Sequence, residues 1–184
     1  MHDGLLDGNS FRTFNVIDDY NREALNITMD KGLSSKRVIR ELDKLVEWRG
    51  TPENLRVDNG PEFISHALQQ WCEGRSIQLR FIQKGKPTQN AYIERFNRTF
   101  RGAVLNRFIF DSLDQARLFS QAWMWMYNNQ RPHKSLGYLT PRSFLLKYGK
   151  RQLGIGSQSV ECAFPTFQQD SDNNWKSLVL SASN

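Results

Sequence analysis

The sequence predicts one α/β domain, built from a mixed β-sheet with helices packed on it. Two stretches of alternating apolar residues come first, at 11–17 and 24–29, and two shorter ones follow at 55–57 and 77–81. The later stretches alternate with apolar stripes of helical period, and this order of elements is typical of a mixed sheet. A chain of 184 residues with 39% hydrophobic residues is long enough to bury a substantial core.

The expected helices are marked by their caps. Ser34 and Ser35 are favourable N-caps before an apolar stripe that ends at Gly50, and Ser112 forms a capping box with Gln115. We expect helices over residues 35–49, 62–74, 90–108, 112–128 and 142–148. The glycine-containing stretches 1–9 and 83–89 are expected to form a turn and a loop.

The character of the chain changes near its C-terminal end. Residues 152–184 are rich in Ser, Gly, Gln and Asn and carry no sustained periodicity, and only 177–180 hints at a strand. We therefore divide the chain into a core of residues 1–150 and an irregular C-terminal tail of residues 151–184.

The overall composition narrows the class of protein. A formal net charge of +6 suits a polyanionic partner. Cys72 and Cys162 form no metal-ligand pattern with the scattered histidines, which argues against a zinc module and against a disulfide scaffold. The sequence contains no apolar run of about 18 residues and no secretory leader, so we expect a reduced cytoplasmic protein without a membrane partner.

Two carboxylates, Asp58 and Glu94, are the candidate catalytic and metal-binding residues. Asp58 follows the alternation at 55–57 and precedes Asn59-Gly60, so we expect it at the end of a strand with its oxygens accessible. Glu94, with 35 residues between it and Asp58, is expected on a basic helix. Mg²⁺ and Mn²⁺ prefer such oxygen ligands, and enzymes acting on phosphodiesters often place two ions about 4 Å apart.

Amide and cationic side chains surround Glu94 on its helix and in the loop before it. Several lie three, four or seven positions away and share its helical face, which is the arrangement expected of a surface that faces phosphates. The predicted nucleic-acid contacts are Lys84, Lys86, Asn90, Arg95, Asn97, Arg98 and Arg101.

Ordinary structural roles also explain these residues taken singly. An Asp before Asn-Gly commonly forms a turn, and a Glu beside Arg on a helix commonly forms a solvated ion pair. Trp123, Trp125 and Tyr127 fit helix packing better than a base-stacking surface, because a helical stripe explains them. His133, which has basic neighbours, fits either a phosphate contact or an ordinary loop position.

Four blocks of sequence carry a more specific pattern. They are Phe11-Arg12-Thr13-Phe14-Asn15-Val16-Ile17-Asp18-Asp19-Tyr20-Asn21-Arg22-Glu23-Ala24, Asp58-Asn59-Gly60-Pro61-Glu62-Phe63, Gly85-Lys86-Pro87-Thr88-Gln89-Asn90-Ala91-Tyr92-Ile93-Glu94-Arg95-Phe96-Asn97-Arg98, and Tyr127-Asn128-Asn129-Gln130-Arg131-Pro132-His133-Lys134-Ser135-Leu136-Gly137 with Thr140-Pro141. Together they resemble the integrase catalytic core of the bacterial IS3-type transposases, which is related to retroviral integrases, and the resemblance covers about residues 3–148.

This resemblance implies the ribonuclease H-like fold and a metal-dependent activity on DNA. It implies that Asp58 and Glu94 are the second and third of three acidic residues, Asp-Asp-Glu, which bind two divalent ions, Mg²⁺ or Mn²⁺. The implied activity is DNA cleavage and strand transfer, in which water or a DNA 3′-hydroxyl attacks a phosphodiester without a covalent protein–DNA intermediate. The implied partners are transposon-end and target DNA and further copies of the chain, in a bacterial cytoplasm and on the nucleoid when bound to DNA.

The chain departs from this family pattern at its beginning. The first acidic residue of the pattern falls immediately before Met1, so we expect a truncated first strand, with Asp3 and Asp18 as the candidates to replace the missing ligand. The helix-turn-helix region that recognises transposon ends in that family has no counterpart in this sequence. Two hypotheses follow: a metal-dependent transposase core, or a catalytically inactive truncated remnant that only binds DNA non-specifically.

Overall fold

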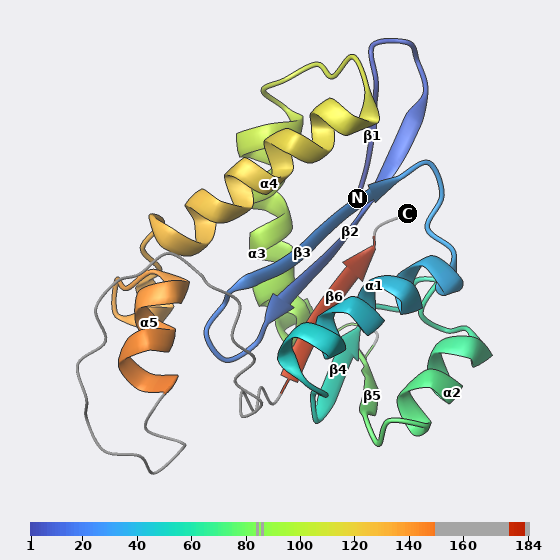
Figure 1. Ribbon diagram of the computed structural model, residues 1–184, viewed down its shortest axis with the longest axis vertical. Helices are drawn as coiled ribbons and strands as arrows, with labels where there is room; N and C mark the ends of the chain where they lie inside the picture. The colour runs from blue at the N-terminus through green and yellow to red at the C-terminus, as the bar shows by residue number, and fades with distance from the viewer. Residues whose placement is uncertain (84, 86, 150–176, 183–184) are drawn as a thin grey trace.

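The computed structural model describes residues 1–83, 85, 87–149 and 177–182 (Figure 1). The strands are β1 (His2–Gly4), β2 (Ser10–Asp18), β3 (Ala24–Asp30), β4 (Asn54–Val57), β5 (Gln78–Phe81) and β6 (Ser177–Ala182). The α-helices are α1 (Ser35–Arg49), α2 (His66–Glu73), α3 (Ala91–Phe100), α4 (Leu113–Asn129) and α5 (Pro141–Tyr148). Three short turns of helix are η1 (Pro87–Asn90), the π-helical η2 (Arg101–Leu105) and η3 (Lys134–Leu136).

All six strands form one mixed sheet, as the sequence predicts. The longest strand, β2, pairs in antiparallel fashion with β3 along one edge. Along its other edge, β1 pairs with residues 10–12 and β6 with residues 14–18, so β1 and β6 lie one after the other beside β2. Strand β6 pairs in parallel with β4, and β4 pairs in parallel with β5. The C-terminal strand therefore occupies the middle of the sheet.

Strand β6 confirms the hint of a strand at 177–180 and departs from the irregular tail predicted around it. Ser177–Ala182 falls within the segment predicted as an irregular tail, and that prediction does not hold for these residues. Leu178 and Leu180 pack into the core beneath α1 and α2, whereas Val179 packs beneath α3, as alternating side chains of a strand do. Pairing with β2 and β4 on both edges stabilises the strand, and that long-range pairing leaves little local signal in the sequence. Residues 151–176 of the predicted tail lie outside the described residues.

Three other boundaries differ from the predictions. Residues 2–4, expected in a turn, form the short strand β1. The helix expected from residue 62 begins at His66, because the Ser65 hydroxyl accepts a hydrogen bond from the Leu68 N–H (3.3 Å) and caps it there. The helix expected over 90–108 is α-helical only to Phe100 and then widens into η2.

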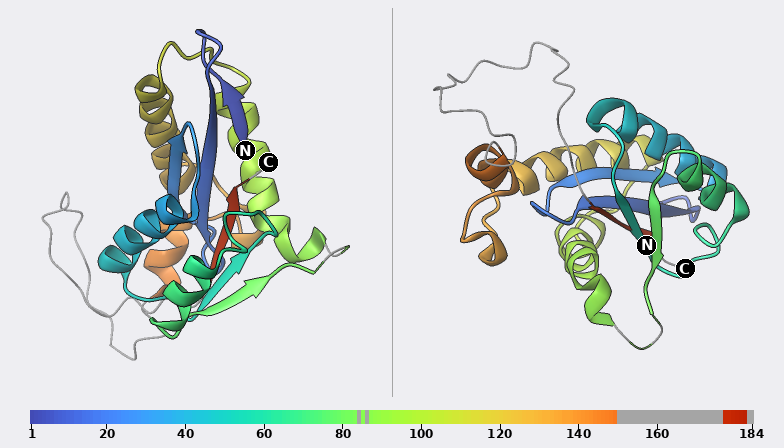
Figure 2. Two further views of the ribbon diagram at one scale, coloured as in Figure 1. Left: turned by 90° about the vertical axis from the view of Figure 1, so that its right-hand side faces the viewer. Right: turned by 90° about the horizontal axis from the view of Figure 1, so that it is seen from below.

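Hydrophobic clusters lie on both faces of the sheet, with α1 and α3 on opposite sides (Figure 2). On one face, Phe14 and Leu55 pack with Leu42 of α1 and Leu68 of α2. On the other face, Ile17 packs with α3. Helix α4 packs along β3 and against α3.

Trp123 and Tyr127 of α4 serve packing, as the sequence favours, whereas Trp125 departs from that prediction. The ring of Phe96 on α3 lies 5.5 Å from the ring of Trp123 and 5.0 Å from that of Tyr127. Trp125 is 58% exposed and lies on the other side of the helix. Within the described part of the chain, none of the helices is both long and apolar enough to span a lipid bilayer.

Candidate functional site

Asp58 lies directly after β4, at the end of a strand whose parallel neighbours are β5 and β6. Its Oδ1 accepts a hydrogen bond from the Gly60 N–H (2.9 Å), and the neighbouring Asn59 side chain is tied to the Ile82 carbonyl (3.1 Å). Carboxyl ends of parallel strands meet at one edge of a sheet and are a usual place for a ligand. The sequence prediction that Asp58 ends a strand is therefore confirmed.

A second carboxylate, Glu62, lies close to Asp58 around Gly60. A Cβ at position 60 would meet Asp58 Oδ1 at 2.9 Å and Glu62 Oε1 at 3.1 Å, so the close approach of both side chains requires glycine. Glu62 is only 5% exposed, and its buried Oε1 has no hydrogen-bond partner. Two carboxylates therefore converge here, one of them with an unsatisfied buried oxygen.

The pKa of Asp58 reflects this environment. Burial raises the pKa of Asp58, and the charge of Glu62 raises it further. Hydrogen bonds from Gly60 and from the Ser181 side chain act in the opposite direction and favour the ionised carboxylate. Ser181 on β6 is therefore a neighbour of the candidate site.

A buried polar network connects Ser181 to α3. The Asn97 side chain donates to the Ser181 hydroxyl (3.0 Å), and its oxygen accepts a hydrogen bond from Asn15 on β2 (2.8 Å). Asn15 and Ser181 are also directly paired across β2 and β6. Arg56 on β4 pairs with Val179 on the parallel strand β6. Two residues further along each strand, Asp58 is therefore level with Ser181.

Glu94 is exposed in the first turn of α3, one helical turn before Asn97. Residues three apart share a helical face, so Glu94 lies on the side of α3 that carries Asn97 to Ser181. Along β6, Val179 packs with the first half of α3 and Ser181 contacts Asn97, which shows that α3 runs in the same direction as β6. Glu94 therefore lies one helical turn before the residue that contacts Ser181, and Ser181 is in turn a neighbour of Asp58.

The two candidate replacement ligands are engaged elsewhere. Asp3 on β1 pairs with Arg101 (3.7 Å). Asp18 is buried at the far end of β2, where its carboxylate accepts from the Tyr20 N–H (2.7 Å) and lies 3.8 Å from Arg49. Among the described residues, no three His, Cys, Asp or Glu side chains form a group that would hold a metal ion.

The predicted nucleic-acid contacts separate into three groups. Arg95 and Arg98 are exposed on α3. Asn97 and Arg101 make contacts within the protein, the latter to Asp3 and the His2 carbonyl, and Asn90 is buried. Lys84 and Lys86 lie outside the described residues.

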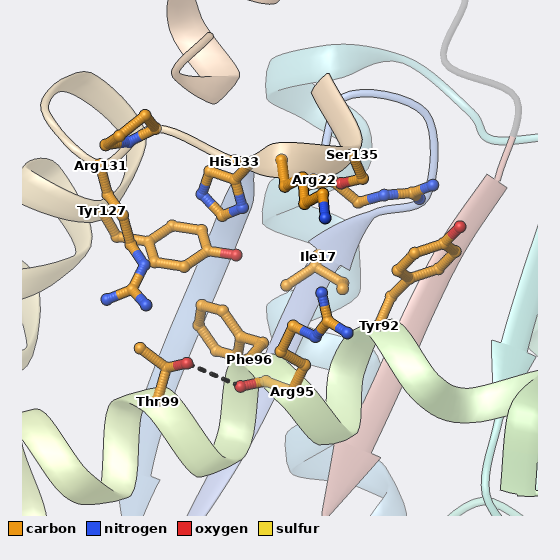
Figure 3. A pocket seen from close by; sticks show the side chains of 12 residues that line it. Ile17, Arg22, Tyr92, Arg95, Phe96, Thr99, Tyr127, Arg131, His133 and Ser135 are labelled. Atoms are coloured by element: carbon orange, nitrogen blue, oxygen red, sulfur yellow. Dashed lines mark hydrogen bonds between the residues drawn. The ribbon is translucent and has the colours of Figure 1, made fainter. Parts of the chain in front are cut away.

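Arg95 also lines a cavity of about 160 Å³ between α3 and the segment that follows α4 (Figure 3). Arg131, His133 and Lys134 line the opposite wall, and Arg22 contributes from the turn after β2. Arg22 places its guanidinium carbon 3.3 Å from the centroid of the Tyr92 ring.

Sequence reasoning missed Asn15, Ser181 and Glu62 as neighbours of the candidate site. Asn15 carried a usable signal, because an amide between apolar neighbours in a predicted strand is expected to need a buried partner. Ser181 carried none, since it lies in a stretch without periodicity. Glu62 lies within the sequence block around Asp58, and nothing in that block distinguishes it as a second carboxylate of the site.

Comparison with known proteins agrees with the family resemblance of the sequence blocks. Two family models described as integrase core domain match residues 1–87 and 75–141. The uncharacterized 31.7 kDa protein of insertion element IS407 from Burkholderia multivorans is 46% identical over 79% of this chain and 53% of its own length. The uncharacterized 39.2 kDa protein of insertion element IS476 from Xanthomonas euvesicatoria is 42% identical over 83% of this chain and 44% of its own length. The chain thus spans about half the length of these relatives.

Solved structures show the same fold. The catalytic core domain of HTLV-2 integrase in complex with magnesium superimposes with a TM-score of 0.61 at 19% identity, covering 78% of this chain and 90% of that one. A chain of the simian T-cell lymphotropic virus intasome superimposes with a TM-score of 0.65 at 18% identity, covering 92% of this chain and 58% of that one. The mixed sheet with helices on both faces is the ribonuclease H-like fold. The chain belongs to the integrase core domain family, as its sequence blocks indicate.

Proposed function

We propose that this chain is the catalytic core of an insertion-element transposase, which cuts DNA and joins DNA ends with the help of divalent ions. The observation that carries the proposal is the pair Asp58 and Glu62 around Gly60, at the carboxyl end of a parallel strand. Membership of the integrase core domain family supports the reaction class.

The carboxylate oxygens at this end of the sheet are the type of ligand that a hard cation prefers. The unpartnered Oε1 of Glu62 is a buried carboxylate oxygen, and such a group is costly unless a proton, a donor or a cation satisfies it. Asp58 and Glu62 would hold the ion from β4 and the turn after it, and Glu94 would approach from α3. A divalent ion bound here supplies charge stabilisation at a phosphodiester and activates the attacking oxygen, and the family pattern uses two such ions. The magnesium bound by HTLV-2 integrase supports this assignment.

The protein's own part is to hold the carboxylates and the DNA in place. The hydrogen bond between Asn97 and Ser181 fixes α3 against β6. It therefore fixes the position of Glu94 along the strand direction relative to Asp58. Arg95 and Arg98 are exposed on the same helix, where they can bind the phosphates of a DNA strand. We also propose that the active form contains several copies of the chain, since related integrases are solved as dimers, trimers and an intasome.

A second function is favoured by one specific observation. The described residues hold no group of three acidic or other metal-binding side chains. This supports a chain that binds DNA through its basic surface and catalyses nothing. The first proposal requires a divalent ion and Glu94 for the joining of DNA ends, whereas the second predicts DNA binding that needs neither.

A strand-transfer assay separates them. The purified chain is incubated with Mn²⁺, a target plasmid and pre-cleaved end DNA of its own element. Glu94→Gln is the test variant, and Glu47→Gln, an exposed position on α1, is the matched control. The catalytic proposal predicts joined products that fall at least about a hundredfold in Glu94→Gln and stay unchanged in the control. DNA binding without any joining, at every Mn²⁺ concentration, would instead establish the second proposal.

A further inference from the structure

The cavity between α3 and the segment after α4 has the properties of an anion site (Figure 3). Its volume is about 160 Å³. Tyr92 and Arg95 approach from α3, while Arg131 and His133 approach from the segment after α4. Three separate parts of the chain, including the turn that carries Arg22, therefore converge on one hollow.

The charge around this cavity is strongly one-sided. Four cationic side chains line it, from Arg22, Arg95, Arg131 and Lys134, and no carboxylate does. Arg22 is paired with Asp19 (2.9 Å), but no acidic partner is found for the other three among the described residues. Like charges gathered around one cavity repel one another, and a bound anion relieves that repulsion.

Neutral polar groups complete the lining. His133 Nε2 is buried and has no hydrogen-bond partner. Burial, together with the charges of Arg131, Arg22 and Arg95, lowers the pKa of His133 to about 4, so the ring is neutral at physiological pH. Its edge packs against the Tyr127 ring at 4.9 Å. In the tautomer that carries its proton on Nε2, the neutral ring can donate to an anion oxygen in the cavity, as its cationic neighbours can.

We propose that this cavity binds a phosphate group of a DNA strand. A phosphate presents several oxygens, so it can meet cations that approach from α3, from the turn after β2 and from the segment after α4 at the same time. Arg95 directly follows Glu94 on α3. A phosphate held by Arg95 therefore places the DNA strand on the helix that carries the candidate catalytic carboxylate. This inference rests on the proposed function for the identity of the DNA and extends it by assigning a binding site.

Salt-dependent DNA binding tests the proposal without metal or catalysis. The affinity of a fluorescent duplex is measured by anisotropy in EDTA between about 50 and 200 mM salt. The variants are Arg131→Gln and Lys134→Gln, both exposed at the cavity, and the matched control is Arg142→Gln, an exposed arginine on α5 outside it. We expect each cavity variant to bind about five- to tenfold more weakly and to lower the salt slope by about one, because one phosphate contact is lost. The control should change affinity less than twofold.

The source of the phosphate is resolved in the same experiment. Duplexes with a 5′-phosphate or a 5′-hydroxyl are compared, and inorganic phosphate is added as a competitor. An equal loss on both duplexes identifies an internal phosphodiester, whereas a loss confined to the phosphorylated duplex identifies a strand end. If the cavity variants bind both duplexes as tightly as Arg142→Gln does, the proposal is overturned. This holds even if inorganic phosphate alone raises the melting temperature of the protein, because that would show the binding of a free ion only. Because the assay contains no divalent ion, its failure would leave the strand-transfer result unaffected.

Discussion

Asn97 on α3 donates a hydrogen bond to the hydroxyl of Ser181 on β6, with 3.0 Å between nitrogen and oxygen. The contact joins the helix that carries Glu94 to a strand that lies beside Asp58. Ser181 is 4% exposed, and its hydroxyl also favours the ionised form of Asp58. The last strand of the chain is thus part of the candidate site as well as part of the sheet.

Replacing Ser181 by alanine should destabilise the protein. Ser181→Ala removes the acceptor of the Asn97 amide and leaves a partly buried donor unpaired, which costs about 1–2 kcal/mol. Urea unfolding measures the change, with Ser177→Ala on the same strand as the control and an expected change below about 0.5 kcal/mol. Equal stability of Ser181→Ala and Ser177→Ala would show that the Asn97 contact contributes nothing.

Adding a methyl group at Gly60 should disturb both carboxylates of the site. The Cβ of Gly60→Ala would lie 2.9 Å from Asp58 Oδ1 and 3.1 Å from Glu62, so one of these side-chain ends must move, and the hydrogen bond from the Gly60 N–H to Asp58 is disturbed at a cost of about 1 kcal/mol. Gly32→Ala is the control, because no atom lies within 4 Å of its added Cβ. Thermal unfolding should show a lower melting temperature for Gly60→Ala alone. A variant as stable as Gly32→Ala would mean that the two carboxylates are not held against position 60.

The stability of the protein should depend on His133 between about pH 4 and 6.5. The pKa of His133 is about 4 in the folded protein and near 6.5 in the unfolded chain, so the unfolded chain binds more protons in this window. Protonation therefore favours unfolding, and this contribution makes stability rise with pH from 4 to 6.5. Urea unfolding at several pH values should show a shallower rise in His133→Asn. Parallel pH profiles for the variant and the wild-type protein would contradict the lowered pKa.

Much of this fold follows from local sequence. The alternation at 11–17 and 24–29 identifies β2 and β3 to within one or two residues, and the caps at Ser34 and Ser112 place the starts of α1 and α4. The position of Asp58 directly after β4 is also predictable, because Asn-Gly after an alternating apolar run favours a turn.

Elements held by distant partners were not predictable in the same way. Strand β6 depends on pairing with β2 and β4, which are far away in sequence, and its six residues give only the hint of a strand at 177–180. The network of Asn15, Asn97 and Ser181 could not be predicted for the same reason, because its hydrogen bonds join residues 82 and 84 positions apart in the sequence. Local patterns report which residues can form an element, and tertiary pairing decides which of them meet.

Calorimetric titration with Mn²⁺ tests the metal site at the end of β4 most directly. We predict that the wild-type chain binds Mn²⁺ and that Asp58→Asn, which keeps the size of the side chain and removes its charge, binds at least about tenfold more weakly. Glu47→Gln should bind as the wild type does. Absence of Mn²⁺ binding to the wild-type chain, or equal binding by Asp58→Asn, would contradict a metal site built on Asp58.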